Sequence, residues 1–254
     1  NNIIEISDLG NKSFYEFIIK KKSKFNNYKN LIRIIIKLQN IKLKRTYNFG
    51  KYKINFQNYS IKNLHKESDL FFDWYLQHCL KSSKQKKIKN ILKKELTKVY
   101  KKLYFKNTVF VHRDFHASNI MVNKNKLGLI DSQDAIIGNP LYDLASLIDD
   151  VRIKLPSNLQ ERLFNFYYSK SKLKKEQYKN LKNDFEILSV QRNLKILGIF
   201  VRLFKRDGKP DYLKYLPYTW RLIERRLKNP VFENFNLMLK KYLKIQKLKK
   251  INNL

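Results

Sequence analysis

The feature that most constrains the fold is a short β-patterned region inside a chain that otherwise follows helical periodicity. Residues 109–111 form an apolar run of strand length, and residues 119–122 and 127–130 form two more such runs. The polar residues 123–126 between the last two are typical of a hairpin turn. The sequence therefore predicts an α+β fold in which a small β-hairpin sheet is inserted in a helical body.

Helical periodicity dominates the rest of the chain. Apolar residues recur on one helical face over 28–39, and residues 194–204 are apolar nearly all round, which predicts a buried central helix. Residues 50–60 have no pattern and are interpreted as a linker. Further helices are expected from residue 63 and over 82–102, 141–153, 157–170, 175–206 and 211–228.

The first residues predict a short strand over 1–9 that ends in a turn at Asp8-Leu9-Gly10. Residues 11–13 then offer side chains that cap helices. Because the chain lacks an initiator Met and starts within an apolar run, we expect it to be a fragment or a processed product.

The charge of the chain is strongly positive, with 55 Lys and Arg against 21 Asp and Glu and a formal net charge of +34. Such an excess would suit nucleic acid, because neutralised phosphates release counterions. The lysines, however, are spread over nearly every segment, and only 11 residues are arginine, which binds phosphate in bidentate fashion. A generally basic surface is therefore favoured over a specific nucleic-acid face, and an RNA-binding helical protein is the lesser alternative.

Cysteine content and hydropathy indicate the compartment. The single cysteine, Cys79, excludes an internal disulfide framework and a cysteine-based zinc cluster, and it favours a reducing interior. No apolar run approaches the roughly 20 residues that span a membrane, and the first residues lack the layout of a signal peptide. We therefore expect a cytoplasmic protein without a membrane span.

A group of polar residues gathers at the predicted hairpin. His112-Arg113-Asp114 is followed after four residues by Asn119, and Asp131 comes twelve residues later. The spacing H-R-D-x-x-x-x-N with a following aspartate is that of a kinase catalytic loop. Phosphoryl transfer requires a carboxylate that accepts the proton of the acceptor hydroxyl and oxygen ligands that hold Mg²⁺ across nucleotide phosphates. Asp114 is therefore the candidate base, and Asn119 and Asp131 are the candidate magnesium ligands.

Other interpretations of these acids and histidines were weighed. His112 and His116 lie four apart but lack the glutamate of a zinc-binding H-E-x-x-H helix. An iron site built on His112 would need a further histidine after His116, and the sequence has none. The acids that follow would cap or solvate a helix, with Asp143 near its start and Asp149 and Asp150 on its solvated face.

The neighbours of Asp114 have supporting roles in this hypothesis. His112 is expected to support the loop through backbone hydrogen bonds, and His116 either helps to position phosphate or packs in the core. Arg113 and Asp143 complete the supporting set.

Longer stretches of the chain carry a family resemblance. They are residues 67–80 (ESDLFFDWYLQHCL), 110–122 (FVHRDFHASNIMV), 127–150 (LGLIDSQDAIIGNPLYDLASLIDD) and 191–210 (QRNLKILGIFVRLFKRDGKP). These stretches resemble the aminoglycoside phosphotransferase/choline kinase superfamily, and within it the bacterial kinases that phosphorylate N-acetylmuramate and N-acetylglucosamine at the anomeric hydroxyl for cell-wall sugar recycling. The chain departs from protein kinases, because Asp131-Ser132-Gln133 replaces Asp-Phe-Gly and no Ala-Pro-Glu segment follows.

The resemblance implies a protein-kinase-like fold, mainly its helical C-terminal lobe. On this interpretation residues 1–62 hold a hinge strand and a linker helix at the boundary of a small lobe, and residues 63–254 form the catalytic lobe. ATP is the implied phosphoryl donor, with its adenine against the backbone of Ile6, Ser7 and Asp8. Ser7 stands where the family usually has an acidic residue.

The resemblance also implies an acceptor site. Gln133 and Asp134 follow the metal-binding aspartate and would face the acceptor. Trp74 would stack on a sugar ring, and Arg202 and Arg206, four apart on a helix face, would pair with a lactyl carboxylate. For Trp74 and the two arginines, a core aromatic and a solvated basic face are alternatives of at least equal weight.

Two parts of a kinase are missing from the pattern: a phosphate-covering loop, and a lysine paired with a helical glutamate. The six glycines are scattered and form no Gly-rich loop. We therefore expect the hinge and helical lobe of an active sugar kinase. The alternatives are an aminoglycoside-type or choline-type phosphotransferase and a non-catalytic relative that serves as a binding module.

Overall fold

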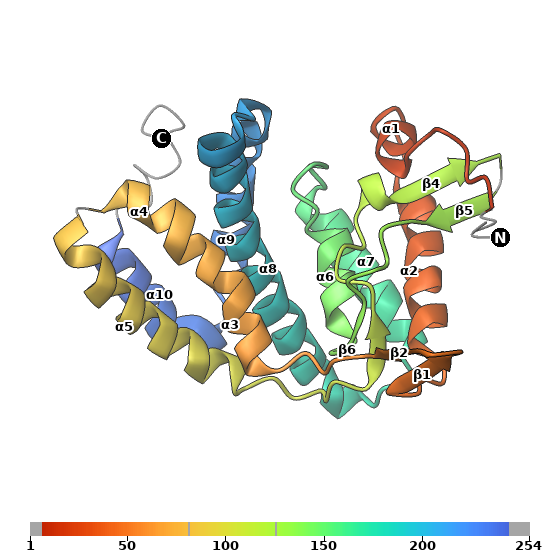
Figure 1. Ribbon diagram of the computed structural model, residues 1–254, viewed down its shortest axis with the longest axis horizontal. Coiled ribbons are helices and arrows are strands. Elements are labelled where there is room, and N and C mark those ends of the chain that lie inside the picture. Colours follow the sequence, from red (N-terminus) through yellow and green to blue (C-terminus); the bar gives the residue numbers. More distant parts are fainter. Residues whose placement is uncertain (1–6, 81, 125, 244–254) are drawn as a thin grey trace.

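A computed structural model of the chain describes residues 7–80, 82–124 and 126–243, and the fold is α+β (Figure 1). The α-helices are α1 (Phe14–Ile19), α2 (Phe25–Gln39), α3 (Ile61–Leu70), α4 (Leu76–Cys79), α5 (Ser82–Tyr100), α6 (Leu141–Ile148), α7 (Ser157–Lys170), α8 (Tyr178–Asp207), α9 (Leu216–Arg226) and α10 (Glu233–Tyr242). The strands are β1 (Thr46–Phe49), β2 (Tyr52–Asn55), β3 (Val109–Val111), β4 (Ile120–Asn123), β5 (Lys126–Leu129) and β6 (Ile136–Gly138).

Helix α8 forms the centre of the molecule. Residues 184–194 are buried without interruption, and the helix packs against α3, α6 and α9. In Figure 1, α3, α5 and α10 lie to one side of α8, and α2, α6 and α7 lie to the other. The helix ends at Gly208, which has a left-handed φ of 65° and donates its N–H to the Phe204 carbonyl at 3.2 Å. The prediction of a central helix is confirmed, although its uninterrupted buried stretch is residues 184–194 and residues 202–204 near its end are only half-buried.

A close crossing joins α8 to the segment after α3, where the chain widens into a π-helix, η1 (Phe71–Tyr75). A Cβ atom on Gly198 would lie 2.2 Å from the carbonyl carbon and oxygen of Leu70. Only a residue without a side chain allows the two backbones to meet at this distance. The crossing places the last turns of α3 directly against α8.

The region between residues 109 and 138 contains two antiparallel pairs of strands. Strands β4 and β5 form the predicted hairpin, with Ile120 opposite Leu129. Strand β3 pairs with β6, with Val111 opposite Ile136. Strand β6 was not among the predicted strands. The pairing closes residues 112–135 into a loop that starts and ends on neighbouring strands.

The interpretation of residues 50–60 as a linker is wrong at its start. Strands β1 and β2 form a hairpin around Gly50, which has a left-handed φ of 56°. All four residues of β2 are exposed, so neither face of the strand is buried and no alternation of apolar and polar residues marks it.

The segment before α1 runs along the β4–β5 hairpin. The turn at Asp8-Leu9-Gly10 is confirmed, because the Gly10 N–H bonds to Asp8 Oδ1 at 2.8 Å. Ser13 caps α1, and its N–H and hydroxyl both donate to Glu16 at 2.8 Å. The strand expected over residues 1–9 is absent at 7–9, and its first six residues lie outside the described part of the chain.

Helix α2 packs against α6, α7 and β3, so a helix assigned to the small-lobe boundary contributes to the same core as the helical body. Gln39 at its end donates to the Pro140 carbonyl at 2.7 Å and accepts from the Tyr167 hydroxyl at 2.8 Å. The division of the chain at residue 62 stays a prediction. In the parts of the chain described above, no helix combines the length and apolar character needed to cross a membrane.

Candidate active site

The loop from His112 to Asn119 is fixed at its start by a buried carboxylate. Asp143, in the first turn of α6, accepts the backbone N–H groups of His112 at 2.8 Å and Arg113 at 3.0 Å. The interpretation of Asp143 as a helix cap is therefore wrong, because its oxygens face the loop and not the free N–H groups of α6. Its supporting position is in keeping with the hypothesis. Burial raises the pKa of Asp143, and the two backbone hydrogen bonds lower it. Burial has the larger effect, so the pKa is about 7.

Two loop residues have left-handed backbones without being glycine. Arg113 has φ 73° and Asp131 has φ 67°. Such conformations are rare outside glycine and persist where the surrounding structure holds them in place, which occurs most often at functional sites. Arg113 directly precedes the candidate base Asp114, and Asp131 is itself a candidate magnesium ligand.

Asn119 links the backbone of Asp114 to the carboxylate of Asp131. Its amide nitrogen donates to the Asp114 carbonyl at 3.1 Å and to Asp131 Oδ2 at 3.3 Å. The Ile130 N–H also bonds to the Asn119 carbonyl at 3.1 Å, which closes the base of the β4–β5 hairpin. The fold thus brings Asn119 and Asp131 together and holds both next to the backbone of Asp114.

The two histidines differ in surroundings. His112 is buried, and its Nε2 lies 3.0 Å from the Ile130 carbonyl beside Asp131, a hydrogen bond to the backbone of the kind that a supporting role would use. His116 is also buried, and burial together with the Arg152 guanidinium lowers its pKa to about 4. A neutral, buried His116 fits the packing interpretation better than contact with phosphate.

The expectation that Asp149 and Asp150 lie on a solvated face is wrong, since both are buried. Asp149 pairs with Arg226 at 2.9 Å. Asp150 accepts the Ala117 N–H at 3.1 Å and so holds the middle of the loop. Helix α6 ends at Ile148 and not at residue 153, so the chain turns both carboxylates inward.

Of the residues assigned to acceptor binding, Gln133 contacts Asp131, and the others have different surroundings. Gln133 donates to Asp131 Oδ1 at 2.6 Å, and both Gln133 and Asp134 are exposed. Trp74 is half-buried and packs on the core.

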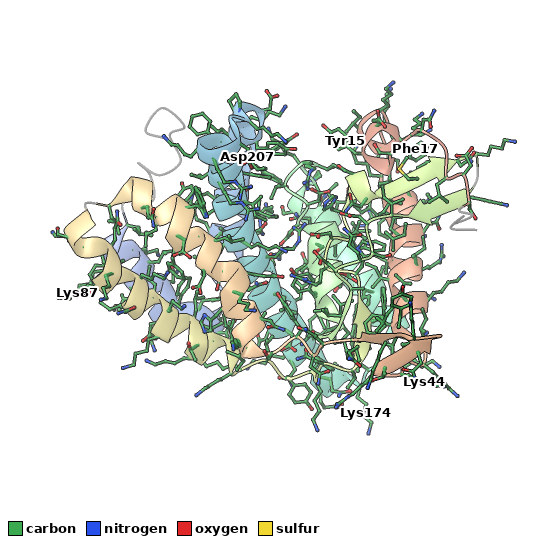
Figure 2. All side chains as sticks on the ribbon, in the orientation of Figure 1. Tyr15, Phe17, Lys44, Lys87, Lys174 and Asp207 are labelled. Atoms are coloured by element: carbon green, nitrogen blue, oxygen red, sulfur yellow. The ribbon has the colours of Figure 1, made fainter. Side chains whose placement is uncertain are left out.

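The two arginines assigned to the acceptor lie in the last turns of α8. Arg206 is exposed and forms two hydrogen bonds to Asp207, at 2.7 and 3.0 Å. Asp207 stands at the end of α8 (Figure 2). Arg202 lies one turn earlier and is half-buried. The guanidinium of Arg206 is thus paired with the Asp207 carboxylate, the kind of group that a lactyl carboxylate would have to replace.

Of the residues assigned to nucleotide binding, Ile6 lies outside the described residues. Ser7 and Asp8 are exposed. The Asp8 carbonyl accepts from Asn123 at 3.3 Å, and the Lys12 carbonyl accepts the Val122 N–H at 2.8 Å. The segment is therefore attached to β4, the strand that begins next to Asn119.

Sequence reasoning missed Glu67, a buried residue of α3 that forms an ion pair with Arg113 at 2.7 Å. The signal was weak, because a single glutamate on an amphipathic helix is usually solvated. Its partner is 46 positions away, and spacing does not reveal such a contact.

The donor set fits magnesium better than zinc. Among residues 7–80, 82–124 and 126–243, no group of three or more His, Cys, Asp and Glu side chains is placed to hold a metal. Mg²⁺ does not need such a cage, since one or two protein oxygen ligands, water and substrate phosphates complete its shell. Asn119 and Asp131 carry oxygen donors on side chains that touch.

Exposed lysines are found on more than one side of the molecule. Figure 2 shows Lys87 at the left edge of the molecule and Lys44 and Lys174 along its lower edge, and all three are exposed. A solvated basic surface agrees with this arrangement.

Helical body, hairpin and loop together define a protein-kinase-like fold. A choline/ethanolamine kinase family protein from Mesorhizobium loti shares it with a TM-score of 0.53 at 15% identity, over 90% of this chain and 69% of that one. Residues 29–176 match the Phosphotransferase enzyme family, and the chain belongs to that family.

Two curated relatives are named N-acetylmuramate/N-acetylglucosamine kinase. The protein from Neisseria meningitidis serogroup B is 28% identical over 226 residues, which are 87% of this chain and 66% of the relative. The protein from Pseudomonas aeruginosa is 32% identical over 165 residues, 63% of this chain and 49% of the relative. The chain thus spans between about half and two thirds of the length of these relatives.

Proposed function

We propose that this chain is the helical lobe of an ATP-dependent sugar kinase that phosphorylates the anomeric hydroxyl of N-acetylmuramate or N-acetylglucosamine. The observation that carries the proposal is the contact of one amide, that of Asn119, with both the Asp114 carbonyl and the Asp131 carboxylate. Family membership and the names of the two relatives support the choice of reaction and acceptor. Residues 1–62 then hold the hinge region, residues 63–254 the catalytic lobe, and the cytoplasm is the expected compartment.

In this proposal Asp114 accepts the proton of the anomeric hydroxyl. The hydroxyl oxygen forms a bond to the γ-phosphorus of ATP, and the bond from that phosphorus to the bridging oxygen of ADP breaks. The products are ADP and the sugar 1-phosphate. An anomeric hydroxyl is more acidic than an ordinary alcohol, so a carboxylate is an adequate base.

Asn119 and Asp131 would hold Mg²⁺, which when bound across the nucleotide phosphates neutralises their charge. The residues that follow, Gln133 and Asp134, are exposed beside Asp131 and would meet the acceptor. The backbone of Ile6, Ser7 and Asp8 would contact adenine. The attachment of Asp8 to β4 supports this assignment, because β4 leads directly from Asn119.

Turnover by the full-length protein tests the proposal. ADP release would be measured with Mg²⁺ and ATP against N-acetylmuramate, N-acetylglucosamine, an aminoglycoside and choline. The matched control is the methyl glycoside of N-acetylglucosamine, in which only the anomeric hydroxyl is blocked. We expect turnover with the free sugars and none with the glycoside. Preference for choline or the aminoglycoside would overturn the acceptor, and nucleotide binding without turnover on any acceptor would indicate a non-catalytic binding module.

A further inference from the structure

The carboxylate of Glu67 is buried and uses both of its oxygens. Oε1 accepts from Arg113, with Nη2 at 2.7 Å and Nε at 3.3 Å. Oε2 accepts from the Tyr142 hydroxyl at 2.8 Å and from Gln191 Nε2 at 2.9 Å. Residues from α6, α8 and the loop thus converge on one side chain of α3.

Glu67 is negatively charged at neutral pH. Burial alone would raise its pKa, but Lys195, whose Nζ lies 3.4 Å from Oε1, and Arg113 outweigh burial and hold the pKa at about 2. A buried charge of this kind is tolerated only where partners satisfy it. Substitution by a neutral residue would therefore leave two cations without their counter-charge.

Arg113 transmits this anchoring to the loop. Its Nη1 also donates to the Asp134 carbonyl at 3.3 Å, in the segment that follows Asp131. Its own backbone is held in the left-handed region at φ 73°. Arg113 directly precedes Asp114, and its guanidinium bonds both to Glu67 in α3 and to the segment after Asp131.

We propose that Glu67 is a positioning residue for phosphoryl transfer, acting through Arg113 to hold Asp114 and the segment after Asp131 in one arrangement. The inference rests on the proposed function for its catalytic consequence, but the anchoring of the loop is a separate physical claim. Glu67 itself touches none of Asp114, Asn119 and Asp131 among the contacts described for it, so its effect is indirect. A residue that only stabilised the helical core would leave the loop geometry unchanged.

Glu67→Gln and Glu186→Gln form a matched pair for the test. Glu186 is likewise a buried glutamate, in α8; it accepts from Asn229 at 2.6 Å and pairs with Arg226 at 3.6 Å, and neither partner belongs to residues 112–119. Two readouts would be compared below the unfolding transition of both variants. The first is backbone amide hydrogen exchange of residues 112–119, which needs no activity. The second is kcat and KM of the full-length enzyme.

We expect Glu67→Gln to speed exchange across residues 112–119 and to lower kcat by about 10- to 100-fold with little change in KM for ATP, as seen when supporting hydrogen-bond partners of a site are removed. Glu186→Gln should do neither. Equal exchange in the two variants would overturn the anchoring. Faster exchange in an enzyme that shows no turnover even as wild type would leave the anchoring intact and overturn only the proposed function.

A second variant covers the case in which Glu67→Gln does not fold. Arg113→Met removes the same contact from its more exposed end and leaves Glu67 with Lys195, Tyr142 and Gln191. It should reproduce the faster exchange and the loss of kcat. If both variants fold, the double variant should lose little more kcat than either single one, because both remove one interaction. Additive losses would contradict action through Arg113.

Discussion

The backbone of Gly198 lies against that of Leu70, so that a Cβ atom at position 198 would fall 2.2 Å from the Leu70 carbonyl oxygen. Two non-bonded heavy atoms cannot lie this close, so any side chain at position 198 would push the backbones of α8 and α3 apart. The contact fixes how near α8 can come to α3, and through α3 it sets where Glu67 meets the loop.

Gly198→Ala is therefore expected to destabilise the protein by about 1–3 kcal/mol or more, the usual cost of overpacking, even though alanine favours helix. Gly208→Ala is the matched control, because a Cβ there meets nothing within 4 Å and only its left-handed φ of 65° is unfavourable. That control should cost about 1–2 kcal/mol. Urea unfolding of both variants provides the comparison. A loss for Gly198→Ala well below about 1 kcal/mol would contradict the close crossing.

Asp114→Asn should abolish most turnover while sparing nucleotide binding. Removal of a general base typically costs about 100-fold or more in rate, whereas the Asp114 carbonyl that accepts from Asn119 is unchanged by the substitution. Steady-state kinetics of the full-length enzyme and titration with MgATP measure the two properties. A variant that retains kcat would exclude Asp114 as the base.

Asp131→Ala should weaken nucleotide binding only when Mg²⁺ is present. The variant removes the carboxylate that contacts both Asn119 and Gln133. Calorimetric titration with ATP, with and without Mg²⁺, separates the metal-dependent part. Asp134→Ala is the control, since it removes a nearby exposed carboxylate but keeps the backbone carbonyl that Arg113 contacts. Equal weakening in both variants would argue for a general loss of negative charge.

The raised pKa of Asp143 should make the stability of the protein depend on pH. Its folded-state pKa, raised by burial to about 7, lies above its ordinary value of 3.8. Its contribution to stability is therefore fully present below 3.8 and is lost as the pH rises through about 7. His116 acts in the opposite sense: with its pKa lowered from 6.5 to about 4, it destabilises the fold as the pH falls below 6.5.

The unfolding temperature of the wild type should accordingly fall between about pH 7 and 8, where His116 is mostly neutral in both the folded and the unfolded state. Asp143→Asn should be less stable overall, because the amide oxygen replaces only one of two carboxylate acceptors, and it should show a flatter slope over this range. Thermal unfolding of the two proteins at several pH values provides the measurement. An equal slope in both would mean that Asp143 does not titrate there.

Local patterns in the sequence were sufficient for the hairpin, the loop and most helices. The spacing of Asp114, Asn119 and Asp131 predicts their approach, because a two-stranded hairpin necessarily returns its second strand to the start of its first. The all-round apolar character of residues 194–204 predicts the central helix for a similarly local reason. Elements with no apolar period, such as β2 and β6, were missed.

The sequence by itself determined which chemical groups meet in the loop, since they lie within twenty residues of one another and a hairpin joins them. Only the tertiary structure decided which acids are buried. Asp143, Asp149, Asp150 and Glu67 occupy positions that a surface acid would equally fill, and their hydrogen-bond partners come from other parts of the chain, up to 124 residues away for Glu67. Periodicity reports which face of a helix is apolar, but the pairing of a buried charge depends on how the helices cross.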